Sequence, residues 1–380
     1  MTEVDYPDLV AYSPDGGLRA EARSPDNESE LPRSEQQSFR YALYDQRTGA
    51  RRWRRDATLT DFRPRALWLN DSGWLVILTH SWLTTGLVAV SPSGAPHLRV
   101  VASPGDDGPL PPHVAARISW TSAGPSWTSG SVGLFVTIGE HEHFTLRTRW
   151  GDRLVLALSR GRVLHDDDAA QLTAPIAAAE RAWALTTLRA STSVLTAAST
   201  PPSERDVEAV TRAMSSARVA GQLELREAIP CLRALARSEV TLASTSTPLD
   251  RDVRALVCRH ELTRTAKTAL WRLGERPPTS PCYSFATRVG GVTAPIAIPT
   301  PRATELADLA RALSTDATPM RALLQLGAPD VLRRREWEYD VATEDGPRTL
   351  VLRWRRGAPR VEGIELGPPR WRGDARDGDA

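Results

Sequence analysis

Two histidines spaced two residues apart, in the run His141-Glu142-His143, are the side chains of this sequence best placed for metal chemistry. Residues at this spacing on a β-strand project from one face, so both imidazoles could bind one metal ion, with a third ligand from elsewhere, for example His165 or Asp166. The alternative is a polar turn between two strands that binds nothing, because isolated histidine pairs seldom form a site. We favour the turn. We therefore predict no catalytic, cofactor or metal residues, and keep His141 and His143 as the metal candidates.

Three consecutive aspartates, Asp166 to Asp168, form a carboxylate cluster of the kind that can bind a cation. They also stand at the start of a stretch with helical periodicity, where negative charge interacts favourably with the helix dipole. We therefore interpret these carboxylates as the beginning of a helix.

Sequence motifs for phosphate, nucleotide and hydrolase sites are absent. The sequence contains no Gly-x-x-x-x-Gly-Lys, Gly-x-Gly-x-x-Gly, His-Glu-x-x-His or Gly-x-Ser-x-Gly, and the single lysine, Lys267, lies within a predicted helix. The cysteines Cys231, Cys258 and Cys282 are odd in number, far apart and without the Cys-x-x-Cys spacing of metal sites. We therefore expect no disulfide framework, no cofactor and no enzyme activity.

Arginines flank several tryptophans, and cations interleaved with aromatic rings suit single-stranded nucleic acid. The clusters are 51–55 around Trp53, 333–335 near Trp337, 354–356 beginning with Trp354, and 370–372 around Trp371. The overall charge does not support this function, because 48 basic residues stand against 46 acidic ones for a net charge of +2. An arginine laid over a buried strand tryptophan is the commoner arrangement. We therefore expect core tryptophans and keep weak nucleic-acid binding as an alternative.

Length and composition describe a protein of several domains. A chain of 380 residues with 41% hydrophobic residues is long enough for two or three cores. The predominance of arginine over lysine, with abundant alanine and proline, is typical of GC-rich bacterial genomes. The N-terminal residues are acidic without the apolar stretch of a signal peptide, and no apolar run is long enough to span a bilayer. We expect a cytoplasmic protein with no membrane partner.

Residues 1–165 have the pattern of an antiparallel β-rich domain. Short apolar stretches alternate with turn signals, and the turn Ser13-Pro14-Asp15-Gly16 recurs in similar form as Asn70-Asp71-Ser72-Gly73. The repeated order of strand, turn, strand and strand resembles the blades of a β-propeller. Because two or three blades cannot close into a ring, this resemblance implies an incomplete propeller or a sandwich-like stack.

Residues 166–276 are predicted to be helical. Amphipathic periodicity favours helices at about 168–189, 203–217 and 225–237, and a fourth from Asp250 to the stop signal at Gly274. Several stretches resemble a HEAT-type repeat: 228–232 (Ala-Ile-Pro-x-Leu), 250–254 (Asp-x-x-Val-Arg), 266–274 (Ala-x-x-Ala-Leu-x-x-Leu-Gly) and a fainter copy from Arg205. The resemblance implies helical hairpins that offer surfaces to protein partners.

The rest of the chain is predicted to hold a Pro-rich linker over 277–302, a small α/β module over 303–366 and a disordered tail over 367–380. The module resembles the two-helix, three-strand domain of the outer-membrane-assembly lipoprotein family. The matching stretches are 326–330 (Leu-Gly-x-Pro-Asp), 337–339 (Trp-x-Tyr) and the strand from 350 to the glycine at 357. The resemblance implies the fold alone, because the family's lipoprotein signal and lipidated cysteine are missing here.

Alternation with a period of two predicts which face of this module's sheet is buried. The predicted core residues are Trp337, Tyr339, Leu350, Leu352 and Trp354, packed against the helix that carries Leu323 and Leu324. The opposite face would bury Glu336, Glu338 and Asp340 without partners, at a large cost.

These patterns together predict a multidomain α+β protein without a catalytic site. Blade-like sheets and helical hairpins both offer broad surfaces, so the expected function is non-catalytic protein interaction or scaffolding, with a protein partner that the sequence does not identify. A metal-dependent enzyme using His141 and His143 and a nucleic-acid binder are the alternatives, although nucleic acid is not an expected partner.

Overall fold

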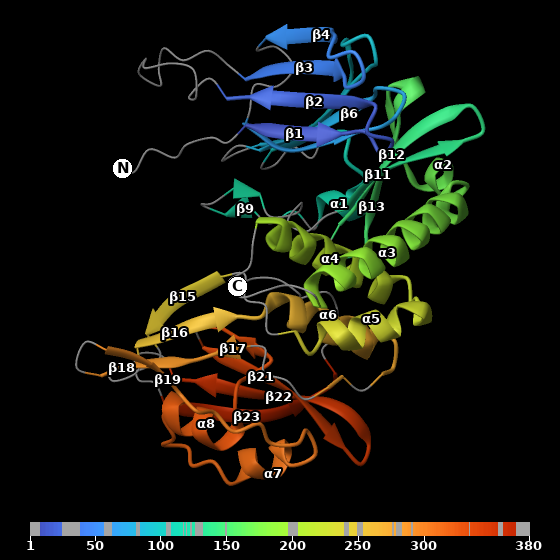
Figure 1. Ribbon diagram of the computed structural model, residues 1–380. Helices are drawn as coiled ribbons and strands as arrows, with labels where there is room; N and C mark the ends of the chain where they lie inside the picture. Colours follow the sequence, from blue (N-terminus) through green and yellow to red (C-terminus); the bar gives the residue numbers. More distant parts are fainter. Residues whose placement is uncertain are drawn as a thin grey trace. The chain divides into compact units, whose positions relative to one another are not determined.

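The structure is a computed structural model that describes most of the chain (Figure 1). The described residues are 8–24, 39–56, 63–80, 84–103, 108–116, 118, 120–121, 124–125, 132–148, 150–196, 204–238, 243–248, 254–275, 277–278, 283–289, 292–333, 335–355 and 360–369. They form a mixed α+β protein whose described sheets are antiparallel and open, which confirms the predicted class. The chain divides into two compact units, Met1–Ala179 and Glu180–Ala380.

The first unit contains a succession of four-stranded sheets in which each strand pairs with the next one along the chain. The first sheet comprises β1 (Leu9–Tyr12), β2 (Leu18–Arg23), β3 (Arg40–Asp45) and β4 (Arg51–Asp56). The second comprises β5 (Arg63–Leu69), β6 (Leu75–His80), β7 (Thr85–Val90) and β8 (Pro96–Ala102). The third comprises β11 (Val132–Ile138), β12 (His141–Arg147), β13 (Arg153–Ala157) and β14 (Arg162–Leu164).

The first hairpin turns of these sheets lie next to one another. The backbone N–H of Asp15, in the β1–β2 turn, donates to Oδ1 of Asp71 in the β5–β6 turn over 2.9 Å. The hydroxyl of Ser72 donates in turn to Oε1 of Glu142, at the start of β12, over 3.2 Å. Corresponding turns of successive sheets are thus aligned along one edge of the unit.

The faces of neighbouring sheets share apolar cores. One core joins the first two sheets and includes Tyr41, Leu43 and Ile77, all fully buried. The other joins the second and third sheets, where the rings of Trp68 and Phe144 lie 5.3 Å apart. Gly133 on β11 permits this contact, because a Cβ at that position would lie 2.6 Å from the Trp68 ring.

Smaller elements complete the first unit: α1 (Pro112–Ala115), β9 (Trp120–Thr121), β10 (Gly124–Pro125), the 3₁₀ turn η3 (Leu158–Arg160) and α2 (Asp166–Ala170). Helix α3 (Thr173–Thr196) begins here, and its Ile176 packs on Val155 and Leu164 of the third sheet. The single helix predicted over 168–189 is therefore two helices. Pro175 explains the break, because it has no N–H to continue the hydrogen bonding of α2 but fits the first turn of α3.

The second unit continues with α4 (Glu204–Gln222), the 3₁₀ turn η4 (Arg226–Ala228), α5 (Ile229–Leu235) and α6 (Glu261–Arg272). Helices α4 and α6 pack so closely that a Cβ added at Gly221 would lie 2.9 Å from the Cα of Ala269. The helix predicted from Asp250 is wrong over its first part: Arg254–Arg259 forms strand β16, paired with β15 (Ala243–Pro248), and α6 begins at Glu261.

The segment predicted to be a linker is structured where it is described. Strand β17 (Tyr283–Ser284) pairs with β16, and β18 (Ala286–Val289) pairs with β19 (Val292–Pro295). Tyr283 and Phe285 are buried in the same core as the C-terminal module. That module contains α7 (Leu306–Arg311), α8 (Pro319–Leu326), β20 (Val331–Leu332), β21 (Glu336–Thr343), β22 (Gly346–Trp354) and β23 (Val361–Gly367). The predicted tail lies outside the described residues from Arg370 onward.

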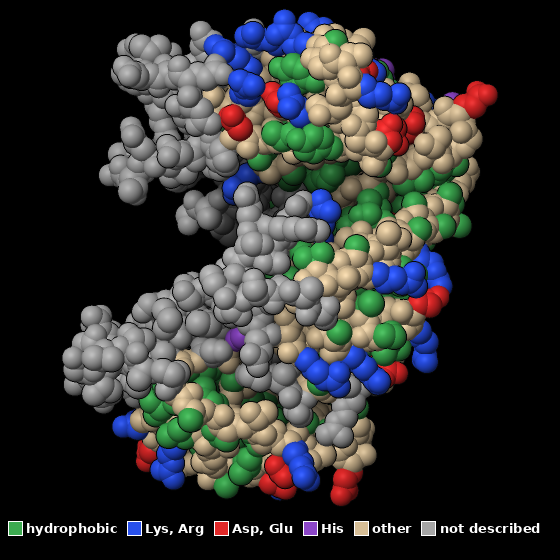
Figure 2. All heavy atoms as spheres, viewed as in Figure 1, with side chains coloured by type: hydrophobic (Ala, Val, Ile, Leu, Met, Phe, Trp, Pro, Cys, Tyr) green, Lys and Arg blue, Asp and Glu red, His purple; other side chains and the backbone are tan. Residues whose placement is uncertain are grey.

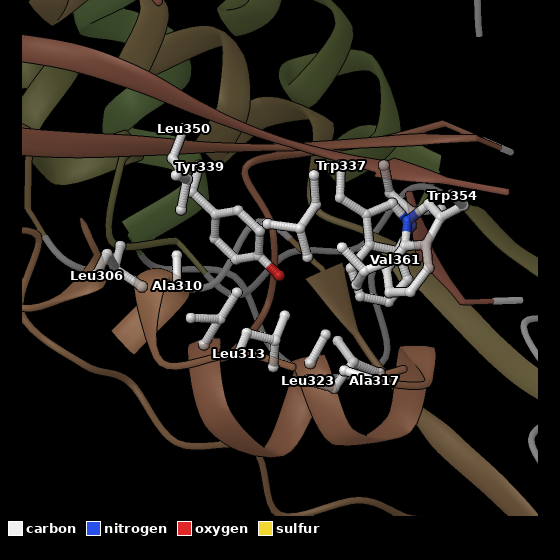
Figure 3. Close-up of a cluster of buried hydrophobic side chains, with 14 of the residues drawn as sticks. Leu306, Ala310, Leu313, Ala317, Leu323, Trp337, Tyr339, Leu350, Trp354 and Val361 are labelled. Atoms are coloured by element: carbon white, nitrogen blue, oxygen red, sulfur yellow. The ribbon is translucent and has the colours of Figure 1, made fainter. Parts of the chain in front are cut away.

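Helices α7 and α8 cover one face of the β20–β23 sheet (Figure 3). Trp337, Tyr339, Leu350, Leu352 and Trp354 are all buried there, as predicted. Thr318 caps α8, because its hydroxyl accepts a hydrogen bond from the N–H of Arg321.

The helix α8 packs on this face through Leu323, as predicted, while Leu324 is 52% exposed. One prediction for this module is wrong. The opposite face of the sheet is also covered, since Glu338 and Asp340 are buried. Their burial is tolerated because both have partners: Arg333 pairs with Glu338 at 2.8 Å, and the Trp271 indole donates to Asp340.

Candidate functional site

The described part of the second unit contains a cavity of about 330 Å³ beside the β20–β23 sheet. This volume lies at the lower end of the roughly 300–1,000 Å³ that is usual for small-molecule sites. Its walls are mainly apolar and aromatic. They include Tyr283, Phe285, Ile296, Ile298, Leu306 and Leu326, together with Pro277, Pro278, Pro299 and Pro301.

Two separate parts of the chain supply the charged and polar side chains of the cavity. Helix α6 supplies Lys267 and Trp271, which are four residues apart and therefore share one face of the helix. Ala269, on the other side of α6, packs against α4. Strand β21 supplies Asp340, and the turn before β20 supplies Asp330. The packing of α6 against α4 thus directs the lysine toward the sheet.

These side chains form a hydrogen-bonded network in which the ammonium of Lys267 lies 3.0 Å from Oδ1 of Asp330. The other carboxylate oxygen of Asp330, Oδ2, accepts the backbone N–H of Asp340 over 2.7 Å. Oδ2 of Asp340 in turn accepts the indole N–H of Trp271 over 3.1 Å. The side chains of Lys267 and Asp330 are only 7% and 12% exposed, so this ion pair is largely removed from water.

The geometry explains why a lysine occupies this position in a chain whose other basic residues are arginines. A guanidinium binds a carboxylate best through both oxygens at once. Here Asp330 offers one oxygen, because the backbone N–H of Asp340 occupies the other. A compact ammonium can contact one carboxylate oxygen without the paired geometry that a guanidinium favours.

Tyr339 and Gly327 shape the wall of the cavity next to the ion pair. The hydroxyl of Tyr339 donates to the carbonyl oxygen of Gly327 over 3.3 Å. Burial raises the pKa of Tyr339 well above its usual value, and the charge of Asp330 acts in the same direction, so the hydroxyl remains a donor. Gly327 has φ 78°, and a Cβ there would lie 2.4 Å from the carbonyl oxygen of Pro299. Glycine at this position therefore allows the 299–301 segment to close against the module.

The charged side chains of the cavity are tied to one another and to the backbone. Lys267 is paired with Asp330, whose Oδ1 lies 3.0 Å from the ammonium nitrogen. Asp330 and Asp340 accept hydrogen bonds from Lys267, from a backbone N–H and from Trp271, which fixes their orientation. Fixed charges at the base of a cavity with apolar walls can orient a bound molecule without taking part in proton transfer.

The predicted histidine pair lies in the first unit. The predicted turn at these histidines is wrong: both belong to strand β12, and the turn is formed by Gly139 and Glu140, because pairing with β11 already begins at Ile138 and His141. His141 is exposed and His143 is buried, with its Nδ1 3.1 Å from the carbonyl oxygen of His141. Because a carbonyl only accepts, Nδ1–H is the donor. Burial lowers the pKa of His143, which favours the neutral ring.

In the part of the chain that the structure describes, His165 and the aspartates that follow it do not form a metal site with these histidines. His165 is exposed and precedes α2, which begins at Asp166 as the carboxylate cluster predicts. Asp168 pairs with Arg162 at 2.8 Å. Across the described residues, no group of three or more His, Cys, Asp or Glu side chains is arranged to bind a metal ion.

In the Arg and Trp clusters considered for nucleic-acid binding, the described tryptophan rings are buried. They therefore do not form a binding surface together with the arginines. Trp53, Trp337 and Trp354 are all core residues with at most 8% of their surface exposed. The arginines beside Trp53 are exposed, and Figure 2 shows basic side chains gathered over the β4 edge of the first sheet. Arg333 is paired with Glu336 and Glu338. The 370–372 cluster, like Cys282, lies outside the described residues, and Cys231 is a free, half-buried thiol.

Comparison with known proteins adds no relative to this chain. No family model, no curated protein and no solved structure matches it. Among the helices that the structure describes, none is long and apolar enough to cross a membrane.

Proposed function

We propose that this chain is a non-catalytic binding protein, in which a blade-like unit and a second unit with a ligand cavity serve interaction with a partner. The cavity beside Lys267 carries the proposal. It combines a volume of about 330 Å³, mainly apolar walls and a set of charged groups held in place by hydrogen bonds. Such a combination is typical of sites that bind and orient a ligand.

We also propose a finer description of the fold. The three meandering sheets of the first unit are taken as an incomplete β-propeller, supported by their common strand order and their aligned first turns. The close packing of α4 and α6 supports a HEAT-like helix pair. The order of α7, α8 and β21 to β23 supports a lipoprotein-type module. Each of these architectures uses its surface for partners, and the step from fold to function is by analogy.

The proposal can be tested by filling the cavity. Ala342 is a half-buried lining residue on the same face of β21 as Asp340. An Ala342→Trp substitution places an indole where a ligand would lie. The matched control, Glu344→Trp, adds the same ring in the exposed turn two residues later.

The experiment is affinity capture with the full chain from its own cytosol, followed by mass spectrometry of bound proteins and of small molecules released on denaturation. We expect the parent and Glu344→Trp to retain the same molecules, chemically unchanged after prolonged incubation, and Ala342→Trp to lose them. If Ala342→Trp captures the same molecules as the parent, those molecules bind outside the cavity. Conversion of a retained molecule would show that the protein is an enzyme.

A further inference from the structure

We infer that the cavity binds a small uncharged molecule with a mainly hydrophobic skeleton that contains a flat ring. This inference rests on the binding function proposed above and specifies the class of molecule that the cavity recognises.

The charged groups that line the cavity already bind one another. Among the described residues these groups are Lys267, Asp330 and Asp340. The ammonium of Lys267 lies 3.0 Å from Oδ1 of Asp330, and Oδ2 of Asp330 accepts the backbone N–H of Asp340 over 2.7 Å. Oδ2 of Asp340 accepts the indole N–H of Trp271 over 3.1 Å. A charged ligand therefore has to compete with interactions that the protein makes within itself.

An ion that enters the cavity also loses its water. The side chains of Lys267 and Asp330 are only 7% and 12% exposed, so little solvent reaches this part of the lining. Removing an ammonium or a carboxylate from water is costly unless a well-placed partner compensates it. Because the two charges of this pair lie side by side, an ion of either sign meets a group of its own sign next to the one that attracts it. An uncharged ligand avoids both costs.

Buried aromatic rings form the inner part of the wall. Trp271, Tyr283, Phe285 and Tyr339 all line the cavity, and each is at most 6% exposed. The rings of Tyr283 and Phe285 lie 6.4 Å apart, within the range in which aromatic rings attract one another through tilted or offset contacts. A flat ring in the ligand extends this cluster. Because the core already fixes these side chains, they do not have to be ordered when a ligand binds, which reduces the entropy lost.

A short extended segment forms a more exposed part of the wall. Ile296 and Ile298 line the cavity and are half-buried, whereas Ala297 between them is exposed and is not part of the lining. The backbone N–H of Ile296 donates to the carbonyl oxygen of Phe285 over 2.9 Å, which ties the segment to the inner wall. A ligand in the cavity covers apolar surface that the two isoleucines still expose, and burial of such surface stabilises a complex in proportion to its area.

The test measures binding of three probes with one ring system to the full chain by calorimetry at pH 7. The probes are the uncharged 2-naphthylmethanol, the anionic 2-naphthoate and the cationic 2-naphthylmethylammonium. We expect the uncharged probe to bind at least about tenfold more tightly than either ion, because only the ions lose favourable hydration without gaining a dedicated partner. If either ion binds as tightly as 2-naphthylmethanol, or more tightly, the inference is overturned.

Variants of the extended segment locate the bound probe. Ile298→Asp places a charge in the wall, and the matched control Ala297→Asp places the same charge on the exposed neighbour. We expect Ile298→Asp to weaken binding of 2-naphthylmethanol at least about tenfold and Ala297→Asp to leave it unchanged. If Ile298→Asp does not fold, Ile298→Ser removes apolar surface without adding charge and should weaken binding severalfold. If a folded variant of Ile298 binds 2-naphthylmethanol like the parent, the probe binds elsewhere and the inference is wrong.

Failure of this inference is distinguishable from failure of the binding function. If the molecules that Ala342→Trp no longer captures are ions, the cavity binds a ligand of another class and only the inference is wrong. If Ala342→Trp captures the same molecules as the parent, the binding function proposed for the cavity fails as well.

Discussion

Replacing Lys267 with methionine tests how the second unit is held together. The substitution retains the length and apolar stem of the side chain and removes its charge. Asp330, whose side chain is 12% exposed, then loses the ammonium that lies 3.0 Å from its Oδ1. Such a group must either stay charged at a high cost in solvation or take up a proton.

The expected cost follows from the burial of the pair. Removing one partner of a buried ion pair usually destabilises a protein by about 3–5 kcal/mol. Asp330→Asn in the same chain removes the carboxylate charge while its amide oxygen can still accept the N–H of Asp340. The double variant should therefore recover most of the lost free energy of unfolding. It should remain about 1–2 kcal/mol less stable than the parent, which is the scale of the hydrogen bonds that are lost.

Urea unfolding of the full chain, followed by tryptophan fluorescence, measures these differences. Trp271, Trp337 and Trp354 all lie in the second unit, so the transition of that unit is visible even if the two units unfold separately. If Lys267→Met lowers the free energy of unfolding by less than about 1 kcal/mol, the description of the pair as buried is refuted. A double variant as unstable as the single one would show that the cost comes from packing and not from charge.

Three further predictions concern other parts of the chain. Trp337→Ala should cost about 3–5 kcal/mol, because this side chain is 1% exposed, whereas Leu324→Ala, at 52% exposed, should leave the urea midpoint nearly unchanged. Gly133→Ala should lower the stability of the first unit by about 1–3 kcal/mol, because its new methyl meets a tryptophan ring; an unchanged melting temperature would argue against the stacking of the second and third sheets. The hydrogen bond from Arg52 lowers the pKa of Asp45 from 3.8 to about 2. Its charged form therefore stabilises the fold above pH 3.8, and the contribution is lost as the pH falls through about 2; titration followed by NMR should show this, and Arg52→Ala should raise the value.

Local patterns were sufficient for those parts of the fold that depend on neighbours in the sequence. The turns at Ser13 and Asn70, the cap at Thr318 and the buried face containing Trp337 all follow from residue types a few positions apart. The hairpin of β15 and β16 did not, because its pairing competes with a helical pattern around Asp250 and depends on contacts that the local sequence does not contain.

The cavity could not be predicted for a related reason. Lys267 and Asp330 are 63 residues apart, and nothing local connects them. One signal was present in the sequence: a single lysine among 48 basic residues, at a position flanked by alanines and leucines in an amphipathic helix. The burial of Asp340 was also unexpected, because alternation places it on the face that would normally meet water. Trp271 from α6 covers that face, so the covering element lies outside the module itself.

This arrangement affects the boundaries of the C-terminal module. A fragment that begins at Pro301 lacks Tyr283 and Phe285, which belong to the module's core, and also Lys267 and Trp271, which cover its polar sheet face. We expect such a fragment to be much less stable than the same residues in the full chain. A fragment that begins before α6 retains these contacts.

The separation between Lys267 and Asp330 also has a consequence for synthesis on the ribosome. The ribosome adds 63 residues after Lys267 to reach Asp330, which takes about 3–13 s at roughly 5–20 residues per second. During that interval α6 has been made but its counter-ion has not, so the ammonium must stay hydrated and this face of the helix cannot close. A nascent chain stalled before Asp330 would therefore present the lysine and the neighbouring apolar surface of α6 to chaperones and proteases. Arrival of the last strands ends that exposure.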